Sequence, residues 1–351
     1  MKKTIILFLI LSLLLCACGQ SGAAPAGQTR EFTDSTGRTV TLPEDITKIA
    51  ISGPLSQIYI LPLAGDLLVG VSTAYAEDAQ SYLPAYIYEK AEIGQLYGGK
   101  GEMDLEALLA AAPEVVIDIG EPKKTTAEDL TALTEQTGIP FIHIDATVAT
   151  APEAYRTLGK LLGREEKAEE LAAWCESTYA MIDAMMEKVD ADGARKTLLY
   201  CLGDKGVNVI ARGSFHAETI NFMSENLAVV EDVVSGGAGN EVDLEQILLW
   251  DPDVIIFAPD SCYEDIAASE QWHSIGAVAR DAFYKTPSGP YGWLSSPPAV
   301  QRYLGMLWLG ELLYPGYAEY DLQEKVTEYY RLFYGCDLTD AMYQELMADS
   351  H

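Results

Sequence analysis

One phrase occurs twice in the chain, and this repeat constrains the fold more than any other feature. DLEALLAAAPEVVI runs from Asp104 to Ile117, and DLEQILLWDPDVII runs from Asp243 to Ile256. Each copy has an Asp that can cap a helix, a short apolar helix, and a Pro with an acidic residue that end it. A run rich in β-branched residues then predicts a buried strand of a parallel sheet. The copies are too far apart for a solenoid, whose period is about 20 to 50 residues, so the repeat predicts two similar α/β domains.

The rest of the chain alternates helix and strand around these copies. After a hairpin with its turn at Ser35 to Arg38, the pattern predicts strands at 48–52, 68–72, 115–119, 141–145, 197–203, 207–211 and 254–258. Helices are expected at 58–68, 126–137, 216–226 and 296–315. Between the two domains, 164–188 has helical spacing of apolar residues without a breaker. At about 1.5 Å per residue this helix would run about 37 Å, long enough to bridge two domains.

The N-terminus indicates export and a lipid anchor. Two lysines, an apolar run from Ile5 to Leu15 and small residues precede Cys18, as in an export signal. The segment Leu15 to Cys18 resembles a bacterial lipobox, in which the last Cys becomes the lipidated first residue. The apolar run is shorter than the ~20 residues that a membrane span needs. We therefore expect a signal peptide at 1–17, a Gly/Ala/Ser/Gln-rich tether at 18–30, an N-terminal lobe at 31–163, a bridging helix at 164–190 and a C-terminal lobe at 191–351.

Charge and cysteine content narrow the function classes. A formal net charge of -30 argues against partners such as nucleic acid or anionic lipid. Beyond Cys16 and Cys18, the chain has no CxxC pair and none of the spacings of a zinc site. The four remaining cysteines allow three disulfide pairings, and unpaired thiols remain equally open: Cys175, Cys201, Cys262 and Cys336.

Taken in order, several segments resemble the iron-siderophore, haem and cobalamin class of ABC-transporter substrate-binding lipoproteins, the class III periplasmic binding proteins. The resemblance covers nearly all of residues 32–315 and rests on DSTGRTVTLPEDITKIAI, LAGDLLVGVS, IGQLYGGKGEMDLEALLAAAPEVVI, ARGSFHAETI, EVDLEQILLWDPDVII and WHSIGAVARDAFYKTP. It implies two Rossmann-like α/β lobes joined by a single long helix, with the ligand held between them. It also implies a monomer at the outer face of the bacterial cytoplasmic membrane, with an ABC-transporter permease dimer as partner and no cofactor.

Ligand contacts are expected in the loops at the carboxyl ends of the strands, at 52–56, 93–101, 211–216 and 287–298. Arg212 offers a planar fork for an oxyanion, although a structural ion pair would explain it equally well. Tyr291 and Trp293 could wall a bulky ligand. The remaining candidates are His216, which could instead satisfy a helix start, and Tyr97 and Lys100 of the Gly-rich loop.

Only four histidines occur in the chain, which disfavours a bare zinc or manganese site built on several imidazoles. We therefore expect a chelated metal, a ferric siderophore-type complex first, or an anion. Haem, a corrinoid and molybdate or tungstate stay open as ligands. An exported chelatase-like enzyme is the rival class, but the expected outer-face anchor argues against it and in favour of a protein that is not an enzyme.

The resemblance also gives the repeated phrase a function. In this family an acidic residue near the start of the corresponding helix on each lobe docks into the permease. The matching positions here are Glu106 and Glu245. A Glu in the first turn also offsets the helix dipole, by about 0.3 to 1 kcal/mol, and duplication of one ancestral lobe would leave such a Glu in both copies.

Overall fold

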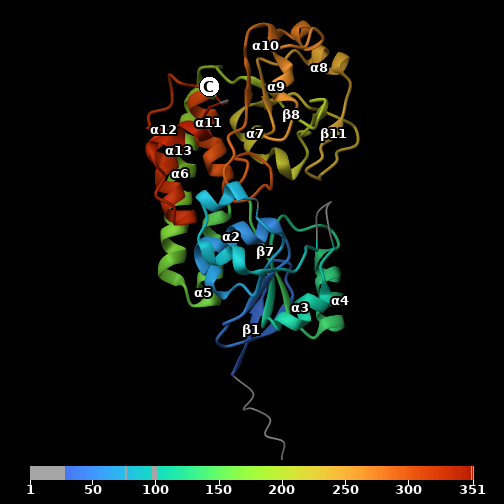
Figure 1. Ribbon diagram of the computed structural model, residues 1–351, viewed down its shortest axis with the longest axis vertical. Coiled ribbons are helices and arrows are strands. Elements are labelled where there is room, and N and C mark those ends of the chain that lie inside the picture. Colours follow the sequence, from blue (N-terminus) through green and yellow to red (C-terminus); the bar gives the residue numbers. More distant parts are fainter. Residues whose placement is uncertain (1–27, 76, 97–101, 349, 351) are drawn as a thin grey trace, which may run out of the picture.

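The computed structural model describes residues 28–75, 77–96, 102–348 and 350, and it consists of two α/β lobes along one long axis (Figure 1). The predicted hairpin opens the chain as β1 (Thr29–Thr33) and β2 (Thr39–Pro43). In the N-terminal lobe the strands β3 (Ile49–Ile51), β6 (Val115–Gly120) and β7 (Phe141–Asp145) form a parallel sheet in the order β3-β6-β7. The short parallel pair β4 (Gly70–Val71) and β5 (Ala91–Glu92) continues from β3 through a bridge between Ile49 and Leu68.

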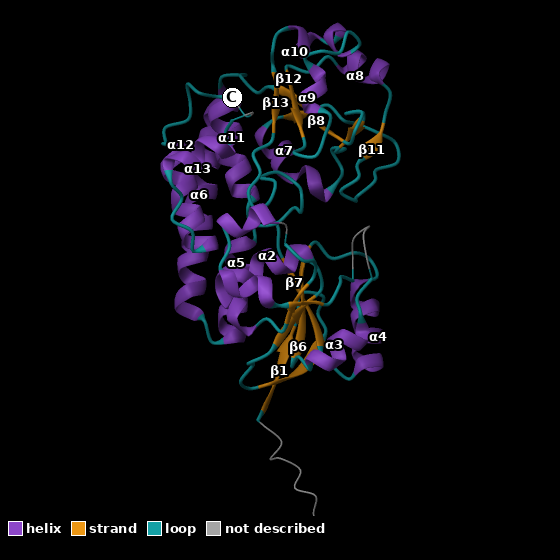
Figure 2. Ribbon diagram, viewed as in Figure 1, coloured by secondary structure: helices purple, strands orange, loops and turns teal. Residues whose placement is uncertain are grey.

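Helices of the N-terminal lobe lie on both faces of this sheet (Figure 2). They are α2 (Pro54–Ala64), α3 (Leu105–Ala111), α4 (Thr126–Thr137) and α5 (Ala151–Leu162), with 3-10 turns at Gly65–Leu67, Glu77–Ser81 and Ala85–Glu89. The predicted bounds of α4 are confirmed. Helix α2 begins four residues before the predicted start at Ile58, because Pro54, whose fixed φ suits a first helical position, opens it.

The bridging helix is α6 (Glu165–Ala191), 27 residues long, and it runs beside both lobes (Figure 1). Of the five apolar residues with helical spacing in this segment, Leu171, Cys175, Ile182 and Met185 are buried, and Trp174 is half-buried. Among the residues that the structure describes, no helix combines the length and apolar character needed to cross a bilayer.

The C-terminal lobe has a mixed sheet, in which the predicted buried strand at 254–258 is parallel to its neighbours. Its order is β11 (Asn240–Glu241), β9 (Asn208–Val209), β8 (Thr197–Leu202), β12 (Val254–Phe257) and β13 (Phe283–Lys285), and β10 (Glu225–Asn226) pairs with the start of β8. Strands β8, β10, β12 and β13 are parallel, whereas β9 is antiparallel to both β8 and β11. The short loop between β8 and β9 explains this, because only a longer crossover could return the chain in parallel.

Among the described residues the C-terminal lobe contains seven helices: α7 (Glu218–Met223), α8 (Leu244–Trp250), α9 (Tyr263–Ile266), α10 (Gly276–Ala279), α11 (Arg302–Leu313), α12 (Leu322–Tyr329) and α13 (Asp340–Leu346). Two 3-10 turns at Phe215–Ala217 and Trp272–Ser274 and a π-helical turn at Tyr330–Tyr334 complete the lobe. Helix α11 begins four residues after Pro298, later than predicted, and its aromatic Trp308 is buried in the core.

The main hydrophobic core does not stop at the lobe boundary. One continuous cluster contains Ile117 of β6, Ile182 of α6, Ile256 of β12 and Leu307 of α11. A smaller cluster lies on the other face of each sheet. In the N-terminal lobe it lies under α3 and α4, and in the C-terminal lobe under α8 and α10. Of the four remaining cysteines, Cys175 and Cys201 are buried and Cys262 and Cys336 half-buried, all as free thiols.

Candidate functional site

The loops expected to hold the ligand come from both lobes: 52–56 and 93–101 follow β3 and β5 in the N-terminal lobe, and 211–216 and 287–298 follow β9 and β13 in the C-terminal lobe. Because β9 runs antiparallel to β8 while β13 runs parallel to it, the carboxyl ends of β9 and β13 lie at opposite edges of the C-terminal sheet. We call the region between the two lobes the interlobe site. Its described polar side chains divide into those that bond within one lobe and those that reach across.

The polar side chains of the loop at residues 52–56 form hydrogen bonds within the N-terminal lobe. Ser52 Oγ lies 2.9 Å from Ser56 Oγ and donates to Asp118, whose other carboxylate oxygen lies 2.7 Å from Nδ1 of His143. All four residues are buried. This network fixes the carboxyl ends of β3, β6 and β7 to one another, so it shapes the wall of the interlobe site instead of offering atoms to a ligand.

Two tyrosines join the lobes. Tyr291, in the loop after β13, donates its hydroxyl to the hydroxyl of Tyr75, in the loop after β4, at 2.9 Å. Tyr88 packs on Tyr75 and Tyr334 packs on Tyr291, with ring centroids 5.7 Å and 6.1 Å apart. Burial raises the pKa of Tyr75 to about 12 and that of Tyr291 well above its usual value, so both phenols stay neutral. The aromatic loop that contains Tyr291 is therefore at the lobe junction.

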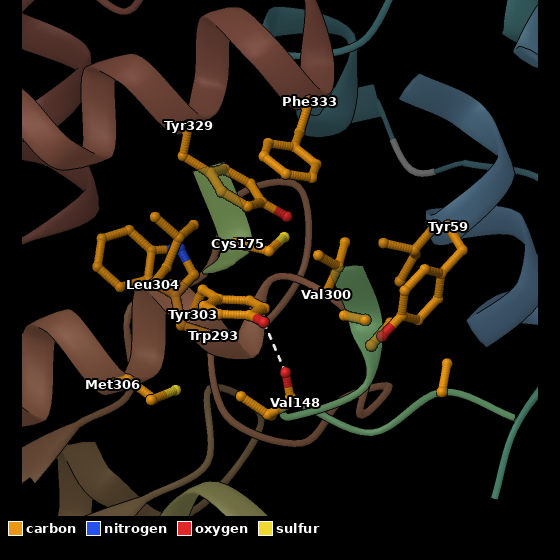
Figure 3. Close-up of a cluster of buried hydrophobic side chains, with 14 of the residues drawn as sticks. Tyr59, Val148, Cys175, Trp293, Val300, Tyr303, Leu304, Met306, Tyr329 and Phe333 are labelled. Carbon is orange, nitrogen blue, oxygen red and sulfur yellow. Dashed lines mark hydrogen bonds between the residues drawn. The ribbon is translucent and has the colours of Figure 1, made fainter. Parts of the chain in front are cut away.

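Trp293 of the same loop lies in the core. Its side chain is fully buried, its backbone N–H donates to the Pro287 carbonyl oxygen at 3.1 Å, and it lies beside Tyr303 and Leu304 (Figure 3). A Cβ added at Gly305 would meet the Trp293 carbonyl oxygen at 2.5 Å, so α11 passes very close to this loop. In this conformation the indole supports the loop from behind and presents no surface to a ligand.

Arg212 follows β9 and is held at one edge of its guanidinium. Its Nε donates to the Asn226 carbonyl oxygen at 2.8 Å, Nη2 donates to the same oxygen, and Glu225 lies 3.8 Å from Nη2. The side chain is 47% exposed. These contacts are those expected if Arg212 serves as a structural ion pair. Within the described chain they leave Nη1 without a hydrogen bond.

His216 is half-buried next to the aromatic loop. Its Nδ1 lies 3.0 Å from the Ser295 carbonyl oxygen. Since a carbonyl oxygen only accepts, Nδ1 carries the hydrogen, and in the neutral ring the lone pair is on Nε2. Burial lowers the pKa of His216, and the charge of Arg302 lowers it further against the opposing effect of the Ser295 bond. The imidazole is therefore neutral near pH 7.

An ion pair within the C-terminal lobe, which the sequence did not indicate, lies against the N-terminal lobe. Arg302, fully buried at the start of α11, lies 2.6 Å from Glu218 Oε2, and its guanidinium stacks over the Phe215 ring at 4.7 Å. Glu218 Oε1 accepts from the backbone N–H of Val148 at 2.8 Å. The Tyr303 hydroxyl donates to the carbonyl oxygen of the same Val148 at 2.5 Å (Figure 3). The peptide groups on either side of Val148, in the loop after β7, are thus gripped by two side chains of the C-terminal lobe.

The other predicted residues lie elsewhere or outside the described chain. Tyr97, Lys100 and Cys18 are outside the described residues. Glu106 and Glu245 are exposed in the first turns of α3 and α8, in different lobes and away from the side that carries α6 (Figure 1). Among residues 28–75, 77–96, 102–348 and 350, no group of three or more His, Cys, Asp or Glu side chains is arranged to hold a metal ion.

Sequence reasoning missed Tyr75, Glu218 and Arg302. A signal for Tyr75 exists, because it is an aromatic residue just after the predicted strand at 68–72. Glu218 and Arg302 carry no such signal. Each occurs in or beside a predicted helix, where a charged residue ordinarily faces solvent.

Comparison with known proteins agrees with this architecture. The family model described as periplasmic binding protein matches residues 55–290. An ABC transporter solute binding protein from Sulfurospirillum deleyianum DSM 6946 is 28% identical, with a TM-score of 0.81 over 91% of this chain and 99% of that one. A periplasmic solute binding protein from Veillonella parvula DSM 2008 is 25% identical, with a TM-score of 0.70 over 92% of this chain and 98% of that one.

The molybdate-bound periplasmic binding protein MolA of Haemophilus influenzae is 20% identical, with a TM-score of 0.69 over 88% of this chain and 99% of that one, and at this identity it shows a shared fold alone. No curated protein matches the chain. The matched relatives are solute-binding transport proteins, and members of the family bind small ligands and work with ABC permeases. With the matched model spanning both lobes and the bridging helix, the chain belongs to the periplasmic binding protein family.

Proposed function

We propose that the chain is the extracytoplasmic solute-binding lipoprotein of an ABC importer. It captures a chelated metal ion, of the ferric siderophore type, at the interlobe site and delivers it to the permease. The single observation that carries the ligand class is the state of His216. Its Nδ1 is bonded to the Ser295 carbonyl oxygen at 3.0 Å and its pKa is lowered by burial, so at neutral pH Nε2 offers a lone pair.

One imidazole lone pair suits a chelate better than a bare ion. A bare transition-metal ion takes about three or four protein ligands, and the other described histidines are engaged elsewhere. His143 is bonded to Asp118 within the N-terminal lobe, and Nε2 of His273 bonds the Ala267 carbonyl oxygen at 2.8 Å. A chelated ion brings most of its own ligands and needs one or two from the protein. Haem and corrinoids belong to the same chemical class and stay within the proposal.

An oxyanion such as molybdate or tungstate is the second candidate, and Arg212 is the observation that favours it. Its half-exposed guanidinium leaves Nη1 free of the contacts described above. Arg binds oxyanions through paired N–H groups, whereas neutral His216 offers no N–H at Nε2. The two side chains therefore favour different ligands, and their substitution separates the two candidates.

The membrane side of the proposal rests on the resemblance of the N-terminus and of the repeated phrase to the family pattern. Cys18 is the proposed lipidation site, and the chain is a monomer tethered at the outer face of the cytoplasmic membrane. Glu106 and Glu245 dock to the two halves of the permease. Changing both to Ala is expected to abolish uptake and leave ligand affinity unchanged; unchanged uptake would sink this assignment.

Native mass spectrometry of the mature body without its lipid tests the ligand class. The probes are ferric siderophores, haemin, cobalamin, molybdate and tungstate. The proposal expects one metal chelate bound one to one, with affinity lost in His216→Ala and retained in Arg212→Ala. His273→Ala and Arg331→Ala are the matched controls, because they remove an imidazole and a guanidinium on exposed surfaces.

The other outcomes are distinct. Binding of molybdate or tungstate that depends on Arg212 and not on His216 would replace the chelate with the oxyanion. Turnover of a porphyrin would overturn the transport function and support the chelatase-like enzyme. Stoichiometric, reversible binding without turnover supports transport.

A further inference from the structure

The repeated phrase has the same three-dimensional form in both lobes. Residues 102–119 and 241–258 match position by position in whether each side chain is buried, half-buried or exposed. Helices α3 and α8 lie on equivalent faces of their sheets, with Leu108 and Ile247 as their buried anchors. Both helices end in a non-glycine residue with positive φ, Ala112 at 47° and Asp251 at 43°.

Part of each copy is explained by what it does for its own lobe. The side chains of Asp104 and Asp243 accept the backbone N–H three residues later, at 2.9 Å and 2.7 Å, and so cap the two helices. After the proline, Glu114 accepts from the N–H of Lys48 at 2.9 Å and Asp253 from that of Thr197 at 3.0 Å. These acids bond the first copy to the start of β3 in the N-terminal lobe and the second to the start of β8 in the C-terminal lobe.

In the part of the chain that the structure describes, two further pairs of identical residues neither cap a helix nor bond to another element of their lobe. Glu106 and Glu245 are exposed, and within the described chain they form no hydrogen bond or ion pair. Leu109 and Leu248 stand three residues further on, which places each next to its Glu on the helix surface, and they are 49% and 44% exposed. The neighbouring positions have diverged, to Ala107 against Gln246, Ala110 against Leu249 and Ala111 against Trp250.

Shared ancestry does not account for this selection. Descent from one lobe explains why two copies exist, and the caps and anchors persist because they hold the fold. An exposed Leu gives its own lobe little stability, so nothing in the fold ties it to the same position twice while the residues beside it change. Single exposed apolar residues are ordinary on protein surfaces. Here an exposed Glu–Leu pair occurs at equivalent places in both lobes.

We infer that Leu109 and Leu248 are apolar anchors of two equivalent docking faces, each completed by its neighbouring Glu, for the two equivalent halves of the permease. This inference rests on the proposed function and adds to it a contact chemistry. Each half of the partner then carries a basic side chain for the Glu, as expected opposite a chain of net charge -30, and an apolar pocket for the Leu. The two helices lie in different lobes, so one partner must span both to engage them (Figure 1).

The two contacts have different physical signatures. An exposed carboxylate attracts a basic partner over about 30 Å at 0.01 M salt, and added salt screens that attraction. Burial of a Leu is nearly independent of salt and acts mainly on the dissociation rate. Leu249, 78% exposed where the first copy has Ala110, extends the C-terminal face alone. The C-terminal face is therefore the larger of the two.

The first test locates the partner. A photo-crosslinking residue replaces Leu109 or Leu248 in the full-length protein, and the crosslinked membrane proteins of the cell that makes it are identified by mass spectrometry. Tyr86 and Val229, also exposed at 40% and 60%, are the matched control positions in the two lobes. Both leucine positions should crosslink to equivalent sites of one permease, and the controls should not. Crosslinks from the controls alone would overturn the inference.

The second test measures affinity for that permease in nanodiscs at low and high salt. Leu109→Ser/Leu248→Ser should lower the affinity about tenfold at both salt concentrations. Glu106→Gln/Glu245→Gln should lower it at low salt only. If the leucine variant binds with wild-type affinity and the glutamate variant binds weakly, the leucines are not anchors. That result would overturn the inference and leave the proposed glutamate docking intact. If both variants bind as wild type does, neither helix is the docking surface. A wild-type protein that binds no permease would instead refute the proposed function.

Discussion

The hydroxyl oxygens of Tyr75 and Tyr291 lie 2.9 Å apart and connect the loop after β4 of one lobe to the loop after β13 of the other. This bond lies within a group of packed aromatic rings that includes Tyr88 and Tyr334. Together with the grip on Val148, it makes the lobe junction a packed interface in its own right, beside the connection through α6. The angle between the lobes is thus fixed by contacts from several elements.

Replacing Tyr291 with Phe removes the hydrogen bond and keeps the ring. The free energy of unfolding should fall by about 1 kcal/mol, the net value of a typical hydrogen bond whose partner stays behind. Urea titration followed by tryptophan fluorescence measures this loss. Tyr317→Phe is the matched control, because it removes an exposed hydroxyl that bonds Asp192 at 2.9 Å, and little change is expected. Equal losses in the two variants would contradict a special role for the interlobe bond.

Ligand binding should close the lobes only slightly. The main core runs without a break from β6 through α6 to β12, so a large rotation would have to expose apolar side chains that are now buried. Small-angle X-ray scattering with and without the bound ligand measures the change in radius of gyration. A marked compaction on ligand addition would show that the shared core opens and would contradict this view.

The alternation of secondary structure was predictable because local patterns determine it. The bounds of α4, the long helix α6 and the strands β6, β7 and β12 follow from periodicity, capping residues and proline positions. The direction of β9 was also within reach, since the loop from β8 is too short for a parallel crossover.

The site was less predictable, because burial depends on contacts between distant segments. Trp293 has Gly and Pro neighbours that indicate a loop, and it is in a loop, but α11 packs against this loop and buries the indole. Arg302 has the sequence context of a surface helix, and its pairing with Glu218 and stacking on Phe215, both in other elements, accompany its full burial. Sequence reasoning thus found the loops and could not tell which of their side chains turn inward.

The Arg302–Glu218 pair should be a strong contributor to stability when one partner is removed. Glu218→Gln leaves a buried guanidinium without its counter-charge and weakens the bond to the Val148 N–H, so unfolding should become easier by about 3 kcal/mol. Chemical denaturation at constant pH measures the difference. Glu169→Gln, which breaks an exposed pair with Arg156, is the control and should change little. A loss in Glu218→Gln no larger than in the control would mean that the pair is not desolvated in solution.

The left-handed residues that end α3 and α8 should respond to glycine in the same way. At Ala112 and Asp251, φ is 47° and 43°, a region where a Cβ is unfavourable. Ala112→Gly and Asp251→Gly should each raise the free energy of unfolding by about 0.5 to 1 kcal/mol. Gly138→Ala is the reverse control, because Gly138 ends α4 at a φ of 71° with open space around it, and it should destabilise. Destabilisation by both glycine variants would show that the side chains at 112 and 251 contribute more than the backbone strain costs.

His216 should make stability depend on pH in a predictable direction. Burial lowers its pKa below the ordinary 6.5, so as the pH falls through about 6.5 the unfolded chain takes up a proton before the folded one does. In that window the unfolded state binds more protons, and the free energy of unfolding therefore falls with decreasing pH until the folded pKa is reached. His216→Asn, whose side-chain amide can still donate to the Ser295 carbonyl oxygen, should lose this part of the slope between about pH 7 and 5. His273→Asn controls for the loss of an exposed imidazole. Denaturant titrations at a series of pH values measure the slope, and a wild-type slope in His216→Asn would mean that His216 is not held neutral by its surroundings.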